Sequence, residues 1–370
     1  MVFLRNSILL ILLVLNCKES DFYETHWNPN LGFQGSPPAH FTELEKNLNP
    51  SACKTCHKEQ WEKWQFSFHA KSYSSGLLWQ KEILNESERK NCLRCHSPLP
   101  ETKALSCASC HVRNYIHYGP PPKEVTNETK TTNLPHDGFV VQNEFEDSKF
   151  CKNCHESPDT GAQINSKKQM ETYTEWKNSK FAKQEIHCQN CHMPGRTHEW
   201  KGIHDKDMVL KGLDIQFLVE RVGSQDKLIC KIASKNIGHY FPTYLVPKIY
   251  VKFYRNNKNQ QTLIDIFTIG RIVNLNLTEE YEDTRIKPGE TRIYSVLSDS
   301  INIKNLEYIL KIDVDPGEQY IRLFEEQKKH LKNTLSKESL FLINESLREK
   351  RNSRYNLITW KRLAPVSLPE

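Results

Sequence analysis

The chain has 370 residues, which is enough for two ordinary domains. Hydrophobic residues make up 37% and the mean hydropathy is −0.67, which is lean for a folded chain but too apolar for a disordered one. The formal net charge is +6, and basic pairs such as Lys328-Lys329 are typical of solvated helix surface rather than of a nucleic-acid interface. We therefore expect an ordered protein that binds no nucleic acid, with part of its core filled by something other than aliphatic side chains.

Residues 1–17 have the pattern of an export signal. Arg5 precedes an apolar run from Ile8 to Leu15, which is too short to span a bilayer but suits a secretory signal. Cys17 follows the run, so the segment resembles a bacterial lipoprotein signal, in which this cysteine becomes the acylated first residue. Asn16 departs from the small residue usual there, so a plain signal or an uncleaved anchor stays an alternative. No other segment approaches ~18 apolar residues, and we predict a periplasmic or cell-envelope protein, lipid-anchored at Cys17 to a bacterial membrane.

Ten of the twelve cysteines fall in five copies of C-x-x-C, and a histidine follows each copy directly. C-x-x-C-H is the attachment signature of c-type haem. Two thioethers must reach the two vinyl groups of one porphyrin, so the thiols need a fixed short separation, and the next residue then supplies the proximal nitrogen to the iron. The predicted attachment cysteines, in motifs numbered one to five along the chain, are Cys53 and Cys56, Cys92 and Cys95, Cys107 and Cys110, Cys151 and Cys154, and Cys188 and Cys191. The predicted proximal ligands are His57, His96, His111, His155 and His192.

Disulfides and zinc are the alternatives for these cysteines. Disulfides would not require a histidine after each second cysteine, and zinc sites pair C-x-x-C units, whereas five is an odd number. Export also fits haem, because bacteria attach haem c outside the cytoplasm. The sequence therefore predicts five covalently attached haems c. Their propionates would offset the positive charge of the chain, which is a further reason not to infer nucleic-acid binding.

Each iron needs a second axial ligand or stays open on one face. Only three methionines follow the first residue, so histidine on both faces is the economical interpretation. The candidates for the distal position are His69, His117, His136, His198, His204 and His239. Four further histidines are expected to be ordinary solvated or structural residues. Three of them lie in surface-like sequence, namely His26, His40 and His330, and His187 is too close to its own motif to reach the iron.

The chain divides by composition. Residues 18–50 are polar and are interpreted as a tether, and residues 51–207 hold all five motifs. Residues 208–316 contain alternating β-rich runs separated by turn signals, which is typical of an antiparallel sandwich. Residues 317–370 are predicted as a helical segment and a tail. The expected fold class is α + β with two domains: a mainly α and coil multihaem domain with a haem-filled core, then a β-sandwich-like domain and a C-terminal helix.

An internal repeat and several motifs carry a family resemblance. Trp64-x-x-Ser67-x-His69-Ala70 aligns with the segment from Trp176, in which Phe181 stands where the first copy has His69. With the third and fifth motifs and Gly238-His239-x-x-Pro-Thr, this text resembles the multihaem c-type cytochromes related to the nitrifier tetrahaem cytochrome c-552/c-554, within the superfamily of hydroxylamine oxidoreductase and multihaem nitrite reductases. The resemblance covers roughly 51–250 and implies closely packed, stacked haems and a distal role for His69.

Electron transfer is the function we expect. An exported pentahaem cytochrome with mostly bis-histidine irons would exchange electrons with redox partner proteins or quinol-linked membrane complexes. The alternative is an oxidoreductase that acts on a small nitrogen or sulfur compound at one open iron. The family's C-x-x-C-K variant is missing, but Phe181 removes one ligand candidate and would allow a five-coordinate iron. No acid–base constellation is identifiable, so no catalytic residue is assigned, and a binding module that docks a partner through the β domain is a third possibility.

Overall fold

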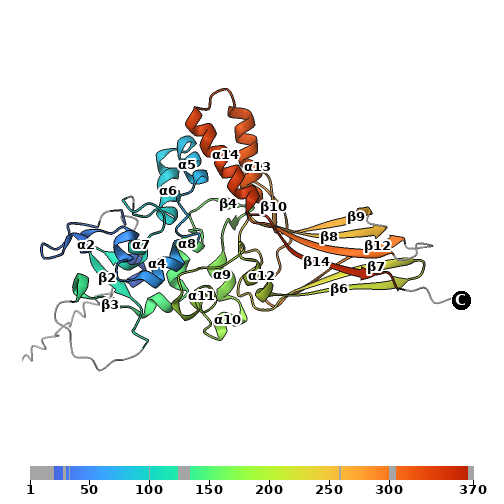
Figure 1. Ribbon diagram of the computed structural model, residues 1–370, viewed down its shortest axis with the longest axis horizontal. Coiled ribbons are helices and arrows are strands. Elements are labelled where there is room, and N and C mark those ends of the chain that lie inside the picture. Colours follow the sequence, from blue (N-terminus) through green and yellow to red (C-terminus); the bar gives the residue numbers. More distant parts are fainter. Residues whose placement is uncertain are drawn as a thin grey trace, which may run out of the picture.

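The protein combines short helices at one end with two β-sheets at the other, and a helical hairpin stands beside them (Figure 1). This confirms the α + β class. The computed structural model describes residues 21–27, 31–32, 34–99, 101–123, 134–257, 260–299 and 306–365. The predicted signal peptide and Cys17 lie outside these residues. In the part of the chain that is described, no helix has both the length and the apolar character needed to cross a bilayer.

The motifs lie on short helices of the N-terminal half. The second to fifth motifs end α6 (Glu86–His96), α7 (Cys107–His111), α8 (Lys149–His155) and α11 (Cys188–His192), and the first begins at the end of α3 (Pro50–Cys53). Capping boxes start α6, α7 and α11 at Asn85, Ser106 and His187. The remaining helices of this half are α1 (Phe22–His26), α2 (Glu43–Lys46), α4 (Lys58–Trp64), α5 (Ser75–Ile83), α9 (Thr172–Lys177), α10 (Lys180–Lys183) and α12 (Lys206–Gly212).

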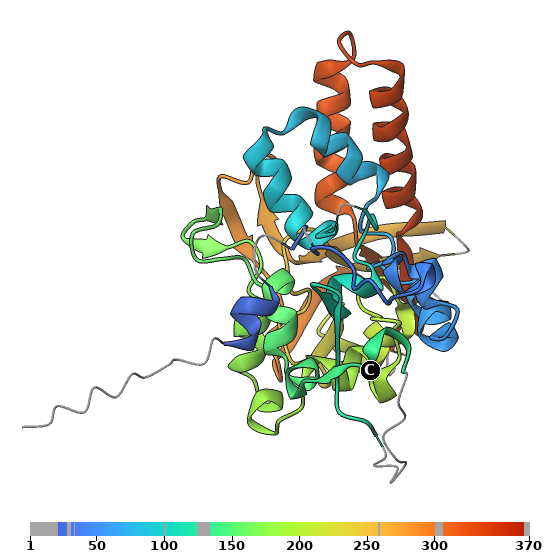
Figure 2. The same cartoon turned by 90° about the vertical axis from the view of Figure 1, so that its left-hand side faces the viewer.

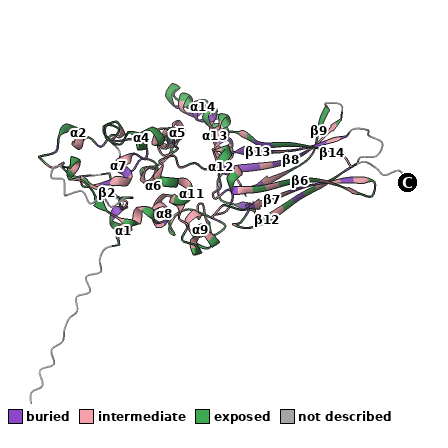
Figure 3. Ribbon diagram, turned by 60° about the horizontal axis from the view of Figure 1, so that its bottom comes forward, coloured by how far each residue is buried: buried purple, intermediate pink, exposed green. Residues whose placement is uncertain are grey.

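Little sheet and few buried aliphatic side chains accompany these helices. The strands here are short: β1 (Val112–Arg113), β2 (Ile116–Gly119), β3 (Val140–Val141), β4 (Gln163–Ile164) and β5 (Lys167–Lys168). Single 3₁₀ turns occur at Pro135–Asp137, Asn143–Glu146 and Pro194–Arg196. Buried residues are sparse in this half and dense in the sheets, as Figure 3 shows. The contrast fits the expectation that something other than aliphatic side chains fills part of the core.

The C-terminal half is an antiparallel sandwich, as its alternating sequence predicted. One sheet has the order β12-β7-β6 and the other β14-β13-β8-β9. Side chains from both sheets, including Phe217, Leu228, Phe253 and Tyr308, form one apolar core. Cys230 is fully buried in that core. The strands of these sheets are β6 (Leu213–Val222), β7 (Gln225–Ser234), β8 (Lys248–Asn257), β9 (Gln260–Ile269), β12 (Thr291–Asp299), β13 (Glu307–Asp315) and β14 (Tyr355–Leu363). A separate two-stranded sheet is formed by β10 (Arg271–Val273) and β11 (Glu280–Asp283).

A helical hairpin lies in the chain between the last two strands of the second sheet. Helices α13 (Glu318–Leu331) and α14 (Lys337–Asn352) pack on α5 of the N-terminal half (Figure 2). The chain then returns to the sheet, where residues 355–363, which we expected in a tail, form strand β14 beside β13. Leu357 and Ile358 explain this outcome, because both are buried and join the sandwich core.

Trp79 is the residue on which the hairpin packing most depends. It is 1% exposed, contacts Ile321 and Phe324, and donates a hydrogen bond from Nε1 to Gln327 Oε1 at 2.8 Å. Replacing Trp79 with alanine should lower the free energy of unfolding by about 3–5 kcal/mol, because it removes a large buried ring. Denaturant unfolding measures the loss. Trp360→Ala is the matched control, since that side chain is 38% exposed; equal losses in the two variants would contradict the assignment.

Candidate functional site

The five motifs form one connected group. The thiols of Cys53 and Cys107 contact each other, which joins the first motif to the third. Cys95 contacts Cys154, which joins the second motif to the fourth. Cys151 contacts Cys188, which joins the fourth to the fifth. The fourth motif also lies within electrostatic range of Cys110 in the third, so it lies at the centre of the group. None of the ten motif cysteines forms a disulfide in the described chain.

Hydrogen bonds between the motif helices support this order. Arg94 in the second motif donates from Nη1 and Nη2 to the Asn153 side chain and carbonyl of the fourth, both at 3.3 Å. The Ser148 amide, at the start of the fourth motif helix, donates to His187 Nδ1 at 3.1 Å. His187 directly precedes the fifth motif, as the sequence shows. The contacts between motifs are therefore part of the packing of their helices.

Three predicted distal histidines lie opposite three motif histidines. The ring centres are 6.2 Å apart for His69 and His155, 6.3 Å for His111 and His198, and 6.2 Å for His192 and His239. Two imidazoles that bind one metal ion from opposite sides, with bonds of about 2.0 Å, place their ring centres about 6 Å apart. The spacing therefore fits an iron held between each pair. Among the described residues no three His, Cys, Asp or Glu side chains gather as a metal-ion site.

Backbone hydrogen bonds fix which ring nitrogen faces a metal. An Nδ1 atom bonded to a carbonyl oxygen leaves Nε2 as the ligating nitrogen. The bond lengths from Nδ1 are 2.8 Å for His111 to Tyr118, 3.0 Å for His198 to Arg196, 2.7 Å for His192 to Lys201 and 2.9 Å for His239 to Tyr240. Both members of two opposed pairs are thus oriented in the same way. This arrangement fits a metal bound by Nε2 of both histidines in these two pairs.

Burial keeps these imidazoles neutral. It lowers the pKa of His69 to about 3, and neighbouring histidines add to the effect. It likewise lowers the pKa of His155 and of His111 to about 4. The neutral imidazole is the form that binds a metal, so the site presents ligands in their binding state at neutral pH.

The first and second motifs differ from the others. His117 and His136 stack on each other with ring centres 3.9 Å apart, and both interact electrostatically with His57 of the first motif. The structure thus brings two candidates to one motif. His204 instead stacks on Phe68, with ring centres 3.9 Å apart. Within the described chain, His96 of the second motif has no ring contact with another histidine.

The four histidines expected to be structural have protein partners. His40 bonds Asp137 at 2.9 Å, His330 bonds Glu326, and His187 accepts the Ser148 amide. His26 bonds the Cys110 carbonyl through Nε2 at 2.8 Å. Its predicted surface position is wrong, because it is only 2% exposed. Helix α1 packs its aromatic residues against Phe145 and Phe150, and this carries His26 into the interior.

In both copies of the internal repeat, the tryptophan bonds the backbone just before a motif. Trp64 Nε1 donates to the carbonyl of Leu105, two residues before the third motif, at 2.9 Å. Trp176 Nε1 donates to the carbonyl of Ile186, two residues before the fifth motif, also at 2.9 Å. Each tryptophan therefore holds the start of a motif helix. Phe181, the residue that replaces histidine in the second copy, packs against Gly238, next to His239.

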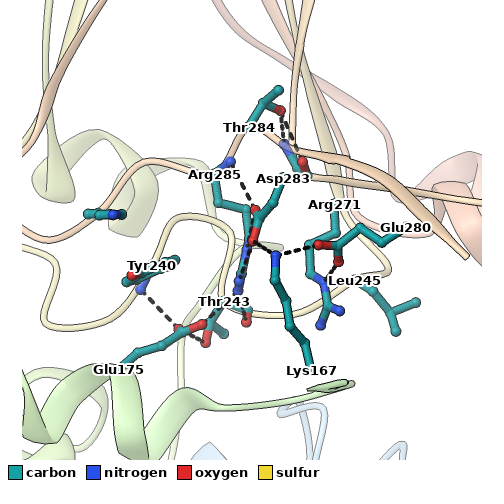
Figure 4. Close-up of polar contacts among 12 residues, drawn as sticks. Lys167, Glu175, Tyr240, Thr243, Leu245, Arg271, Glu280, Asp283, Thr284 and Arg285 are labelled. Atoms are coloured by element: carbon teal, nitrogen blue, oxygen red, sulfur yellow. Dashed lines mark hydrogen bonds and ion pairs between the residues drawn. The ribbon is translucent and has the colours of Figure 1, made fainter. Parts of the chain in front are cut away.

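Two residues of the site were not predicted from the sequence. Glu175 and Arg285 form a buried ion pair at 2.6 Å beside the loop that carries His239 (Figure 4). They are 110 positions apart, so no local pattern connects them. One signal in the sequence could have indicated this site. Glu175 is a charged residue in α9, a helix that packs on a motif.

Comparison with known proteins agrees with this geometry. Residues 52–134, which include the first three motifs, match the family described as cytochrome c554 and c-prime. No curated protein matches the chain. A penta-haem cytochrome c552 from Thermochromatium tepidum shares the fold, with a TM-score of 0.63 and 15% sequence identity over 86% of this chain and 99% of that one. The family match over residues 52–134 and the shared fold support a multihaem c-type cytochrome family for this chain.

Proposed function

We propose that this protein is an exported electron carrier that holds five haems c, mostly between pairs of histidines. The observation that carries the proposal is the set of three opposed pairs at 6.2–6.3 Å, each made of one motif histidine and one distal candidate. Bound haem supplies one-electron redox chemistry, and two strong axial ligands leave no coordination position for a substrate. The protein's part is to hold both ligands and to bring the motifs together.

The distances between the rings support three ligand pairs. His155 takes His69, His111 takes His198, and His192 takes His239. For the first motif, His136 is the better oriented candidate, because its Nδ1 bonds the Gly138 carbonyl at 2.7 Å. His117 stacks on it and is the alternative.

Export and partners belong to the same proposal. The apolar run before Cys17 supports secretion to the periplasm or cell envelope, and Cys17 supports a lipid anchor. Haem attachment outside the bacterial cytoplasm requires such export. A tethered carrier of this kind would exchange electrons with redox partner proteins or with quinol-linked membrane complexes.

The second motif favours one alternative function. His96 makes no ring contact with a second imidazole among the described residues, and its pKa is lowered by burial and by nearby Lys350. An iron held there by one histidine could bind a small nitrogen or sulfur compound. We expected the open iron to be the one that Phe181 leaves without a histidine. Phe181 instead lies near His239, which faces the fifth motif. An oxidoreductase acting at the second motif is therefore the second candidate.

The haem content tests the proposal. We expect five haem equivalents per chain in the matured holoprotein, and four in the double variant Cys53→Ala/Cys56→Ala, because each motif attaches one haem. Absorbance of the pyridine haemochrome and intact mass measure the content. Cys230→Ala is the matched control and should keep all five, since Cys230 lies in the sandwich core. A content of four in the unaltered protein would contradict the proposal.

Electron paramagnetic resonance separates the two candidate functions. Low-spin signals from every haem support an electron carrier. A high-spin signal worth one haem, which persists in a His239→Ala background and changes on addition of nitrite or hydroxylamine, supports an oxidoreductase at the second motif.

A further inference from the structure

His239 reaches the fifth motif from the other half of the molecule. It lies on the loop between β7 and β8, whereas His192 ends helix α11. Their rings are 6.2 Å apart and nearly parallel, with an interplanar angle of 12°. The alignment of two ligands on separate structural units depends on what fixes the loop to the helices.

Glu175 makes that connection from helix α9. Its carboxylate is 7% exposed, and Oε2 accepts hydrogen bonds from the Tyr240 amide at 3.0 Å and from Thr243 Oγ1 at 2.7 Å (Figure 4). Tyr240 is the residue next to His239, and its carbonyl is the partner of His239 Nδ1. One carboxylate oxygen thus holds the backbone that orients the imidazole.

Arg285 holds the same loop from the sandwich. Its Nη1 donates to Glu175 Oε1 at 2.6 Å and to the Thr243 carbonyl at 2.8 Å. Asp283 grips the other side of the guanidinium through two bonds of 2.9 Å. The guanidinium also lies 4.9 Å from the ring centre of Tyr240. The planar, bidentate geometry of arginine gives this contact a fixed direction.

The packing leaves no room for the loop to shift inward. A side chain at Gly238 would meet Trp176 Cδ1 at 3.2 Å and Phe181 at 3.6 Å. Thr172 of α9 adds a hydrogen bond to Thr243 at 2.8 Å. Glu175 and Arg285 are both buried, so removing one partner leaves a buried charge with fewer counter-charges. The ion pair therefore connects α9 to the loop that carries His239.

We infer that Glu175 and Arg285 are positioning residues that hold His239 opposite His192, so that the sandwich completes the axial ligand set of the fifth haem. The inference rests on the proposed ligation of that haem by these two histidines. Hydrogen-bonded partners of metal ligands change metal affinity by about 10–100-fold when they are mutated. Loss of Glu175 should weaken the bond between His239 and iron by a factor in that range.

The experiment compares five variants of the holoprotein. We expect His239→Ala to give one high-spin, carbon-monoxide-binding haem by electron paramagnetic resonance and CO titration. Glu175→Ala should raise the CO affinity of that same haem by about 10–100-fold, and Glu175→Gln, which keeps the bond to the Tyr240 amide, should have a smaller effect. Lys167→Gln is the matched control, because Lys167 contacts the same network at Asp283 and Glu280 but is 45% exposed.

The outcomes separate the two ideas. If His239→Ala leaves every haem low-spin, the proposed ligation fails and the inference fails with it. If His239→Ala opens the haem while both Glu175 variants bind CO like the unaltered protein, only the positioning role is overturned. Glu175→Gln decides the matter if Glu175→Ala does not fold. Trp79→Ala, which should destabilise the fold elsewhere, should leave the fifth haem low-spin, so a general loss of stability cannot imitate the result.

Discussion

Replacing His69 with alanine should convert about one haem in five from low spin to high spin and open it to carbon monoxide. His69 is the imidazole opposite His155, with ring centres 6.2 Å apart, and its own ring packs at 4.6 Å from Trp200. Burial, together with neighbouring histidines, lowers its pKa to about 3 and so keeps it neutral at neutral pH. Without it, His155 has no ring contact with another imidazole among the described residues, so an iron bound there as proposed would lack its second histidine.

Optical and electron paramagnetic resonance spectra measure this change. His69→Met provides a graded comparison, since a methionine ligand raises the potential of a haem relative to histidine. His40→Ala is the control, because His40 forms an exposed ion pair with Asp137. A fully low-spin spectrum for His69→Ala would show that the opposed rings do not share an iron.

Removing the fourth motif should have the largest effect on electron transfer. Its cysteines contact both the second and the fifth motifs and lie near the third. We expect Cys151→Ala/Cys154→Ala to slow electron exchange between the remaining haems by more than any other double variant, because it removes the central haem. Stopped-flow or pulse-radiolysis kinetics should then show separate populations that equilibrate slowly.

The matched variant is Cys53→Ala/Cys56→Ala at the first motif. Cys53 contacts Cys107 of the third motif, so the first motif lies at an end of the group. Its removal should lower the number of haems by one and leave exchange among the others fast. Equal kinetics in the two variants would argue against a central fourth motif.

The sequence determined much of the fold because its signals are local. C-x-x-C-H spacing predicts where haem attaches, and alternation of apolar and polar residues predicts the sandwich. Strand β14 was not predicted, because the short apolar segment around Leu357 and Ile358 does not indicate which strand it will pair with. His26 was placed on the surface for a similar reason, since only the packing of α1 on Phe145 shows that it is buried.

Ligand pairing is the part that sequence could not supply. His69 and His239 are both plausible ligands by context, but the motif that each one faces depends on how distant helices and loops pack. The Glu175–Arg285 pair is of the same kind, because two charges 110 positions apart form a pair only in the folded chain. These contacts are tertiary, and they determine the chemistry of each site.

The position of His239 on the β7–β8 loop also makes the fifth site an optical reporter of folding order. Its motif is synthesised before the sandwich, and the residues that fix the loop extend to Arg285. In the proposed ligation, His239 can reach the fifth haem only after the later part of the chain has folded against α9. Absorbance of that one haem during refolding should therefore record when the two halves of the molecule join.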